Sequence, residues 1–335
     1  MTPADLKARR TRRALSQTEL ARRVGVSRTT LWRWEQGRAA PSPEQSRRLR
    51  QSLRAAPSPP QRPNGLPIAQ LRSGAATLFE TPKAAIVHGD ALGLLPKLPE
   101  ACCDLIFADP PYNIGKRFAA FHDRWPNDAA YLTWCERWLS QCLRVLSPTG
   151  SLYLMASTQA MPQLDLWLRE RIAVLSRIIW HYDSSGVQAR RRFGSMHEPI
   201  LHCVADASHY TFNSEAIAVE ARTGARRKLI DHRKPVPAPY SSTKVPGNVW
   251  YFPRVRYRMA EYEAHPSQKP EALLERIVAA SSNRGDLVLD PFAGTFTSGA
   301  VATRLGRRFL GFESQDEYVA IGRRRLGLSG PTRAT

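Results

Sequence analysis

The feature that most constrains the fold is an alternation of short apolar runs with helical periods, which begins near residue 75. Ala101–Ala108, Asp286–Asp290 and Arg308–Phe312 are apolar runs of strand length, and the segments between such runs are long enough for helices. Strands that alternate with helices are typical of a parallel α/β sheet. We therefore predict a doubly wound, mostly parallel α/β fold, with ligands at the carboxyl ends of its strands.

A smaller, all-α unit is expected at residues 1–56, which carry fourteen Lys/Arg against four Asp/Glu. Ser16 and Glu19 form a capping-box pattern that begins one short helix, and Gly25 permits a tight turn. Ser27 then caps a second helix, Arg28–Gln36, which ends at Gly37. Five prolines follow within residues 57–67, so we predict a semi-rigid linker over residues 57–75.

The stretch SQTELARRVGVSRTTLWRWEQGRAAPS resembles the helix-turn-helix of phage repressors. The resemblance implies that the second helix enters the major groove of DNA. Its DNA-facing residues would be Arg28, Thr29, Thr30 and Arg33, and Gln17 would contact a phosphate. The alternative is a helical module for dimerisation or protein contacts.

The net charge of +20 and the isoelectric point near 10.4 favour a polyanionic partner, because each phosphate contact releases counterions. A basic surface that serves only solubility is the alternative. The five cysteines form no C-x-x-C pair, so no metal site of the zinc-ribbon kind is expected. Without a signal-like N-terminus or a long apolar run, we expect a cytoplasmic, nucleoid-associated protein that binds double-stranded DNA and no membrane.

The apolar run Ala101–Ala108 is followed by the motif Asp109-Pro110-Pro111-Tyr112. An exocyclic amine of adenine or cytosine is a poor nucleophile, because its lone pair is delocalised into the ring. The Asp109 carboxylate and the Pro110 carbonyl can both accept hydrogen bonds from that amine, and two prolines hold the acceptors in place beforehand. Tyr112 can stack on a base taken out of the duplex. We interpret these four residues as catalytic.

With this motif in place, residues 84–327 resemble the beta class of DNA amino-methyltransferases, in which the catalytic motif precedes the cofactor motif in a circularly permuted order. The resemblance implies a Rossmann-like fold, S-adenosylmethionine as the cofactor, and base flipping. It is closest to the adenine-specific branch. The stretches SSGVQA, GSMHEPIL, YTFN and KVPGNVWYFPRVRYRM resemble orphan enzymes associated with the palindrome ATGCAT.

The second apolar run leads into a glycine turn at Gly294, and the third ends at Glu313, whose position suits a ribose contact. Neither a G-x-G-x-x-G nor a P-loop is present, which disfavours NAD and nucleotide triphosphates. Most of the family has Gly where this chain has Phe296, so the backbone after Gly294 is an open question. The resemblance adds an adenine contact from Asp90 and a carboxylate contact from Ser267 and Lys269.

The full set of cofactor-binding residues expected from these motifs is Asp90, Ala91, Ser267, Lys269, Asp290, Phe292, Ala293, Gly294, Thr295 and Glu313.

No Pro-Cys pair is present, which argues against a cytosine-C5 enzyme, and Asp at the first motif position favours adenine over N4 of cytosine. We expect a catalytic half at 76–182, target recognition at 183–262 and a cofactor half at 263–328. Basic clusters interleaved with aromatic residues suit DNA contacts in the middle region. The residues proposed for those contacts are Arg190, Arg191, Arg192, Arg254 and Arg256; with Arg258, the last two would share one face of a strand.

The sequence thus predicts a site-specific adenine-N6 DNA methyltransferase. The alternatives are an N4-cytosine enzyme, a transcriptional regulator whose methylase activity is incidental, and an RNA N6-methylase. Family members are often dimers, so a homodimer is an option, and a restriction-modification role with a cognate restriction enzyme is another. The sequence decides neither.

Overall fold

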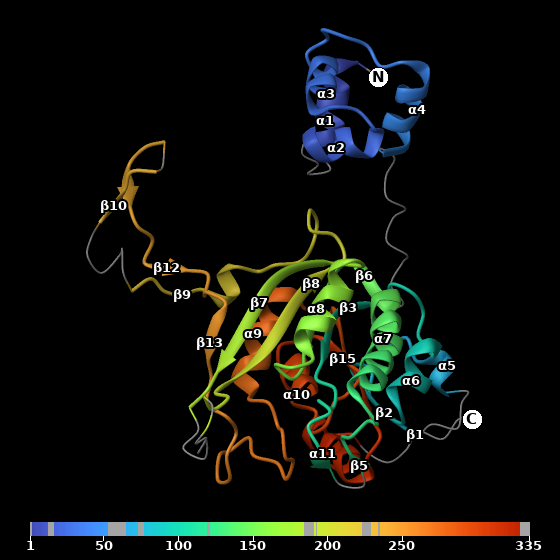
Figure 1. The fold of residues 1–335 in the computed structure, drawn as a ribbon, viewed down its shortest axis with the longest axis vertical. Helices are drawn as coiled ribbons and strands as arrows, with labels where there is room; N and C mark the ends of the chain where they lie inside the picture. Colours follow the sequence, from blue (N-terminus) through green and yellow to red (C-terminus); the bar gives the residue numbers. More distant parts are fainter. Residues whose placement is uncertain are drawn as a thin grey trace. The chain divides into compact units, whose positions relative to one another are not determined.

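The computed structural model describes residues 2–12, 17–52, 65–72, 77–118, 121–183, 191, 193–222, 229–233 and 235–328. The chain forms two compact units, residues 1–62 and residues 63–335, which are taken separately below (Figure 1). The boundary falls inside the linker expected from the prolines.

The N-terminal unit consists of α1 (Pro3–Arg12), α2 (Gln17–Val24), α3 (Arg28–Glu35) and α4 (Pro43–Ser52). The expected pair α2 and α3 is present, with Gly25 at φ 78° in the turn between them. The Ser27 hydroxyl accepts from the Thr30 amide at 3.0 Å, as an N-cap should. The Ser16–Glu19 capping box lies outside the described residues.

Helices α1 and α4 are additions to the predicted pair, and they supply the apolar residues that the pair lacks for a core. Leu6 from α1 and Leu49 from α4 are buried against Leu20, Leu31 and Trp34. Two amphipathic helices alone bury too little apolar surface to be stable, so the flanking helices complete the unit.

The second unit is built on a nine-stranded sheet in the order β1-β2-β15-β14-β3-β6-β8-β7-β13. Neighbours from β2 to β6 are parallel, β1 and β8 run antiparallel to their neighbours, and β13 runs parallel to β7. The prediction of a mostly parallel sheet is confirmed. The strands are β1 (Thr77–Glu80), β2 (Ala84–His88), β3 (Cys103–Ala108), β6 (Leu146–Met155), β7 (Ala173–His181), β8 (His197–Val204), β13 (Val249–Tyr251), β14 (Leu287–Asp290) and β15 (Arg308–Glu313).

Helices cover both faces of this sheet, and β3 shows why: Leu105 and Phe107 enter one core cluster while Ile106 and Ala108 enter the other. The first face carries α9 (Glu271–Ser281), α10 (Thr297–Arg304) and α11 (Asp316–Leu326). The second face carries α5 (Ala69–Arg72), α6 (Ala91–Leu94), the 3-10 turn Leu95–Lys97, α7 (Asp128–Val145) and α8 (Met161–Arg169). Figure 1 shows α7 in green and α9 to α11 in orange to red around the sheet.

The packed chain begins earlier than the expected linker end at residue 75. Ile68 and Leu71 are buried in the cluster on the second face, although the sequence around them is rich in proline. Their apolar side chains, rather than the proline spacing, decide where the second unit starts.

The adjacent strands β14 and β3 mark a topological switch point. They pair in parallel, with Leu289 opposite Ile106. The chain leaves β3 through α7 toward β6 and leaves β14 through α10 toward β15, so the two connections run in opposite directions on opposite faces. A crevice opens at the carboxyl ends of two such strands, which is where Asp109 and the glycine turn lie.

The described residues between β8 and β13 form short ladders. They are β9 (Val219–Glu220) with β12 (Thr243–Lys244) and β10 (Ile230–Asp231) with β11 (Ala238–Pro239), preceded by the 3-10 turn Glu215–Ile217. A hairpin of β4 (Arg117–Phe118) and β5 (Phe121–His122) follows the DPPY motif. Within the described part of the chain, no helix is long and apolar enough to cross a membrane.

Candidate active site

A cavity of about 480 Å³ lies at the carboxyl ends of β3 and β14, within the range of small-ligand sites. All the residues that the sequence assigned to catalysis and to the cofactor line it. They are Asp109, Pro110, Pro111 and Tyr112, together with Asp90, Ala91, Ser267, Lys269, Asp290, Phe292, Ala293, Gly294, Thr295 and Glu313. Five segments that are separate in the sequence therefore share one cavity.

Asp109 directly follows β3, and both of its carboxylate oxygens are hydrogen-bonded. Oδ1 accepts from the Tyr112 hydroxyl at 2.6 Å, and Oδ2 lies 2.6 Å from Lys269 Nζ. Burial raises the pKa of Asp109 above its usual value, against the opposing effect of the Lys269 ammonium. The motif thus presents a half-buried, hydrogen-bonded carboxylate rather than an exposed turn.

Glu198 completes this group, and the sequence reasoning missed it. Its Oε2 atom lies 3.0 Å from the Tyr112 hydroxyl and 3.5 Å from Lys269 Nζ. Burial alone would lower the pKa of Lys269, but Asp109 and Glu198 raise it above its usual value. Glu198 lies in the stretch GSMHEPIL, which was used only for the family resemblance. The available clue was a charged residue on a strand that has neighbours on both sides in the sheet, because charged side chains are rarely buried there without a partner.

Asp123 is a second residue that was not anticipated, and it holds the loop after the motif. Its buried carboxylate accepts from the amides of Tyr112 at 3.2 Å, Ile114 at 3.4 Å and Lys116. Asn113 between them has φ 57°, a conformation that Asn tolerates better than most residues. The loop that carries Tyr112 is therefore fixed to the β4–β5 hairpin.

The cofactor side contains two buried acids with different partners. The Asp290 carboxylate accepts from the Phe292 amide at 3.0 Å and from the Ser298 hydroxyl, and burial raises its pKa to about 7. Glu313 accepts from the Gly294 amide at 2.8 Å, and its other oxygen accepts from the amides of residues 314 and 315. Glu313 thus fixes the glycine turn, and its expected ribose contact stays a prediction.

Phe296 stands where most of the family has Gly, and the structure shows how the turn accommodates its side chain. It takes the left-handed conformation, φ 57° and ψ 33°, at the start of α10. Its ring is fully buried, and a Cβ added at Gly322 or Gly311 would lie 2.2 Å or 2.8 Å from it. Two glycines elsewhere in the chain therefore provide the space for the ring, and the turn keeps a backbone suited to glycine at a cost of about 1 kcal/mol.

The segment from His265 to Lys269 is fixed by hydrogen bonds on both sides. The Ser267 amide donates to His265 Nδ1 at 3.2 Å, and Lys269 Nζ donates to the Ser267 carbonyl at 3.2 Å. His265 is packed edge-on against Tyr318, with ring centroids 4.5 Å apart, and burial lowers its pKa to about 3. The imidazole is therefore neutral at physiological pH.

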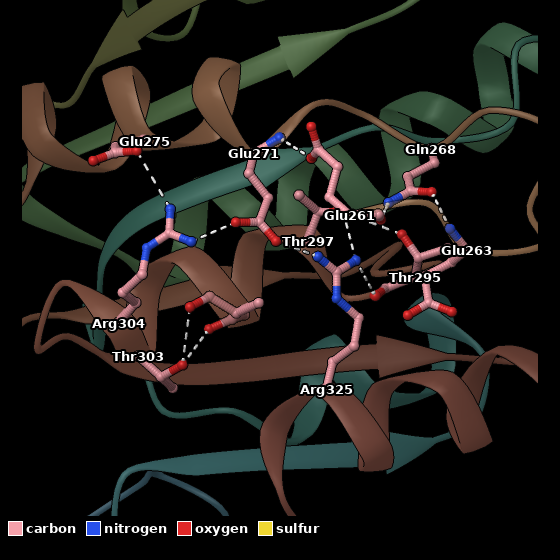
Figure 2. A network of polar contacts seen from close by, with 12 residues as sticks. Glu261, Glu263, Gln268, Glu271, Glu275, Thr295, Thr297, Thr303, Arg304 and Arg325 are labelled. Carbon is pink, nitrogen blue, oxygen red and sulfur yellow. Dashed lines mark hydrogen bonds and ion pairs between the residues drawn. The ribbon is translucent and has the colours of Figure 1, made fainter. Parts of the chain in front are cut away.

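Figure 2 shows the polar network that joins this segment to the glycine turn. Arg325 on α11 donates to the Thr295 carbonyl at 3.1 Å and to Glu271 at 2.7 Å, while Glu261 accepts from the Glu271 amide at 2.7 Å. Gln268 accepts from the Glu263 amide at 2.7 Å. These hydrogen bonds connect the start of α9 to the glycine turn at Gly294.

The predicted DNA contacts in the N-terminal unit lie on α3. Arg28, Thr29 and Arg33 are exposed, and the half-buried Thr30 hydroxyl lies 2.8 Å from that of Ser27. Gln17 instead donates to the buried Glu35 carboxylate at 2.7 Å, so its amide group already has a partner in the unit. A phosphate contact from Gln17 stays a prediction.

The basic residues of the middle region are arranged differently from the expected strand face. Residues 252–258 form no strand, and Arg258 has φ 74°, so the prediction that Arg254, Arg256 and Arg258 share a strand face is wrong. Arg254 lies over the Tyr182 ring at 5.2 Å and lines the cavity, whereas Arg256 is exposed and donates to the Asp183 carbonyl. Arg191 is exposed. Arg190 and Arg192 lie outside the described residues.

Comparisons with known proteins agree with this geometry. A family described as DNA methylase matches residues 103–324, and a family described as helix-turn-helix domain matches residues 4–60. The chain is 56% identical over 253 residues to the DNA adenine methyltransferase YhdJ of Escherichia coli, covering 76% of this chain and 86% of that protein. It is 34% identical over 243 residues to the type II methyltransferase M.HpaI of Haemophilus parainfluenzae, covering 72% and 73%.

Two solved structures share the fold at low sequence identity. The cytosine-N4-specific PvuII DNA methyltransferase superposes with a TM-score of 0.58 at 17% identity, covering 75% of this chain and 89% of that one. The complex of M1.HpyAVI with its ligand SAM gives a TM-score of 0.51 at 24% identity, covering 73% and 100%.

Proposed function

From the premise that this chain belongs to the DNA methylase family, we propose that it transfers a methyl group from S-adenosylmethionine to N6 of adenine in double-stranded DNA. One observation carries the proposal: the DPPY carboxylate and the Gly294 turn open into the same cavity. The name of the relative at 56% identity supports adenine as the base.

The residues of the cavity fit the methyl donor. When bound, S-adenosylmethionine supplies an electrophilic methyl carbon on a cationic sulfur. Among the carboxylates that line the cavity, those of Asp90, Asp290 and Glu313 suit a ligand that carries positive charge and ribose hydroxyls. Phe292 adds an aromatic wall that is itself packed edge-on against Trp138 at 4.9 Å. The wall is rigid, which suits a site that must align two reactants.

The catalytic role of the motif follows from its acceptors. Asp109 and the Pro110 carbonyl accept hydrogen bonds from the adenine amine and draw its lone pair out of the ring. Tyr112 offers its ring to the flipped base while its amide is held by Asp123. Alignment supplies most of the acceleration, because the methyl donor is already activated.

The N-terminal unit is a helix-turn-helix domain, and we propose that it binds DNA through α3. Arg28, Thr29 and Arg33 are exposed together on this helix. The charges of Arg28 and Arg33 are part of the net +20 of the whole chain, which favours phosphate contacts. Such a domain could also repress transcription, which makes a regulator the second candidate function.

The test is to incubate the purified chain with unmethylated DNA and S-adenosylmethionine and to identify modified nucleosides by mass spectrometry. We expect N6-methyladenine from the wild type and none from Asp109→Ala. N4-methylcytosine would overturn the choice of base. An unmodified digest, together with promoter binding by Asp109→Ala, would favour the regulator. Light scattering on the same preparation tests the homodimer that family resemblance suggests.

A further inference from the structure

The starting point is that Asp109 has no oxygen without a hydrogen-bond partner. Oδ1 accepts from the Tyr112 hydroxyl and Oδ2 contacts the Lys269 ammonium, both at 2.6 Å. These are short, charge-assisted contacts in a buried site. Each carboxylate oxygen can accept a second hydrogen bond, so an adenine amine that reaches Asp109 has to share its oxygens with these two donors unless one of them turns to another acceptor.

Glu198 is placed to be that acceptor for both donors. The Oε2 atom of Glu198 lies 3.0 Å from the Tyr112 hydroxyl and 3.5 Å from Lys269 Nζ. The two donors and the two carboxylates thus form a closed ring of four groups. A buried donor that loses its partner costs the full desolvation of that group, whereas a donor that changes partners within the ring does not.

The charges of the ring also favour such an exchange. Two carboxylates share the single ammonium of Lys269, whose side chain is 7% exposed, so neither acid holds the cation alone. If only Asp109 were present, the Lys269 ammonium would be strongly tied to it, and the amine would have to compete with a full ion pair.

We propose that Glu198 is a positioning residue: it takes over the Tyr112 hydroxyl and the Lys269 ammonium when the adenine amine enters, and so leaves the Asp109 oxygens to that amine. The inference rests on the proposed function. It assigns to β8, through Glu198, a part in the reaction that the DPPY motif does not show.

The test uses the full chain with Glu198→Gln and Glu198→Asp. Gln keeps the shape but removes the charge that attracts Lys269, so we expect the single-turnover methylation rate to fall about tenfold, the effect of one unmade buried hydrogen bond. Donor affinity should change less than the rate, since Glu198 contacts the donor site only through Lys269 and does not contact the glycine turn. Glu198→Asp keeps the charge and should recover part of the rate.

Glu275→Gln is the matched control, because Glu275 is an exposed partner of Arg304 at 3.3 Å, remote from the ring. It should keep the wild-type rate. A Glu198→Gln variant with the wild-type rate would overturn the inference while leaving adenine methylation intact. Absence of methylation by the wild-type chain would instead refute the proposed function.

A titration separates a positioning role from a purely structural one, and it needs no turnover. Glu198 raises the pKa of Asp109 and Lys269 lowers it. Glu198→Gln should therefore move the titration of Asp109 to lower pH and Lys269→Met should move it to higher pH, as followed by carbon-13 NMR of aspartate-labelled protein. The other ionisable groups that interact with Asp109 are Tyr112, Lys116, Tyr131 and Asp290.

An Asp109 titration that moves to lower pH in Glu198→Gln and to higher pH in Lys269→Met supports the exchange of partners within the ring. Identical titrations in the wild type and in Glu198→Gln would contradict it, because the two carboxylates would then not share their donors.

Discussion

Two carboxylates, the buried Glu35 in the N-terminal unit and the half-buried Asp109 in the second unit, each contact a cation, but their pKa values shift in opposite directions. Glu35 accepts from Arg10 Nε at 2.6 Å, from Arg10 Nη2 at 3.2 Å and from the Gln17 amide at 2.7 Å. Burial raises the pKa of Glu35, but Arg10 and Gln17 outweigh it and hold that pKa below its usual value.

At Asp109 the balance is reversed: burial, together with the charge of Glu198, which shares the one ammonium, raises the pKa of Asp109. The difference shows how to distinguish a structural ion pair from a reactive group in this molecule. A carboxylate whose charge is fully matched stabilises a fold, whereas one that competes for its cation is ready to exchange partners.

The largest expected effect is at the unbalanced site. Asp109→Asn keeps the shape of the side chain but replaces one acceptor with a donor that faces Lys269 or the amine. We expect the methylation rate to fall about 10³-fold, since a preorganised polar contact is lost in a buried site. Single-turnover kinetics measures this. A fall of less than about tenfold would show that alignment alone carries the reaction.

A substitution in the Glu35–Arg10 ion pair should lower the stability of the N-terminal unit and leave the methylation rate unchanged. Arg10→Met leaves the fully buried Glu35 carboxylate without its cation, and we expect the N-terminal unit to lose about 3 kcal/mol. Hydrogen exchange should accelerate across residues 17–52 and remain unchanged in β3 and β14. Unchanged exchange in the N-terminal unit would break the comparison.

The pH dependence of the same unit follows from the lowered pKa of Glu35. Its stabilising contribution is fully present above the unfolded-state value of 4.5 and is lost as the pH falls through the lower folded-state pKa. Acid should therefore loosen residues 17–52, and Glu35→Gln should flatten this response. Exchange measured across the acidic range is the check.

A substitution at Gly322 tests whether the glycine turn depends on how the Phe296 ring packs and not on the charges around it. Gly322→Ala would place a Cβ 2.2 Å from the Phe296 ring, and we expect a loss of about 1–3 kcal/mol together with weaker donor binding. Calorimetry with and without the donor measures both. Gly93→Ala is the control, because nothing lies within 4 Å of a Cβ there. Equal stability in the two variants would contradict the packing of Phe296.

The third acid, Asp290, extends the comparison to ligand binding. Its pKa is about 7, so it becomes ionised as the pH rises through neutrality, and an ionised carboxylate attracts a cationic donor. We expect donor affinity to rise by up to about tenfold from about pH 6 to about pH 8, and Asp290→Asn to abolish that rise. Isothermal titration calorimetry at several pH values measures the donor affinity and tests this expectation. An affinity independent of pH would mean that Asp290 does not sense the donor's charge.

The sequence predicted the α/β alternation, the helix pair around Gly25 and the motif residues that line the cavity, because each depends on a local pattern. Residues such as Glu198 and Asp123 depend instead on which segments the fold brings to Asp109, and a single chain read in order does not contain that information. Arg254 was predicted as part of a strand, but its segment follows a strand of only three residues. Phe296 could be flagged as unusual, although its accommodation by Gly311 and Gly322 required the packing.

The most direct test of the central claim, that one cavity serves both the donor and the amine, is a crystal structure with S-adenosylhomocysteine bound. We predict that the nucleoside lies between Asp90, Glu313 and Phe292, with the sulfur end toward Asp109. A ligand bound elsewhere, or an Asp109 carboxylate that faces away from the ligand, would contradict the account.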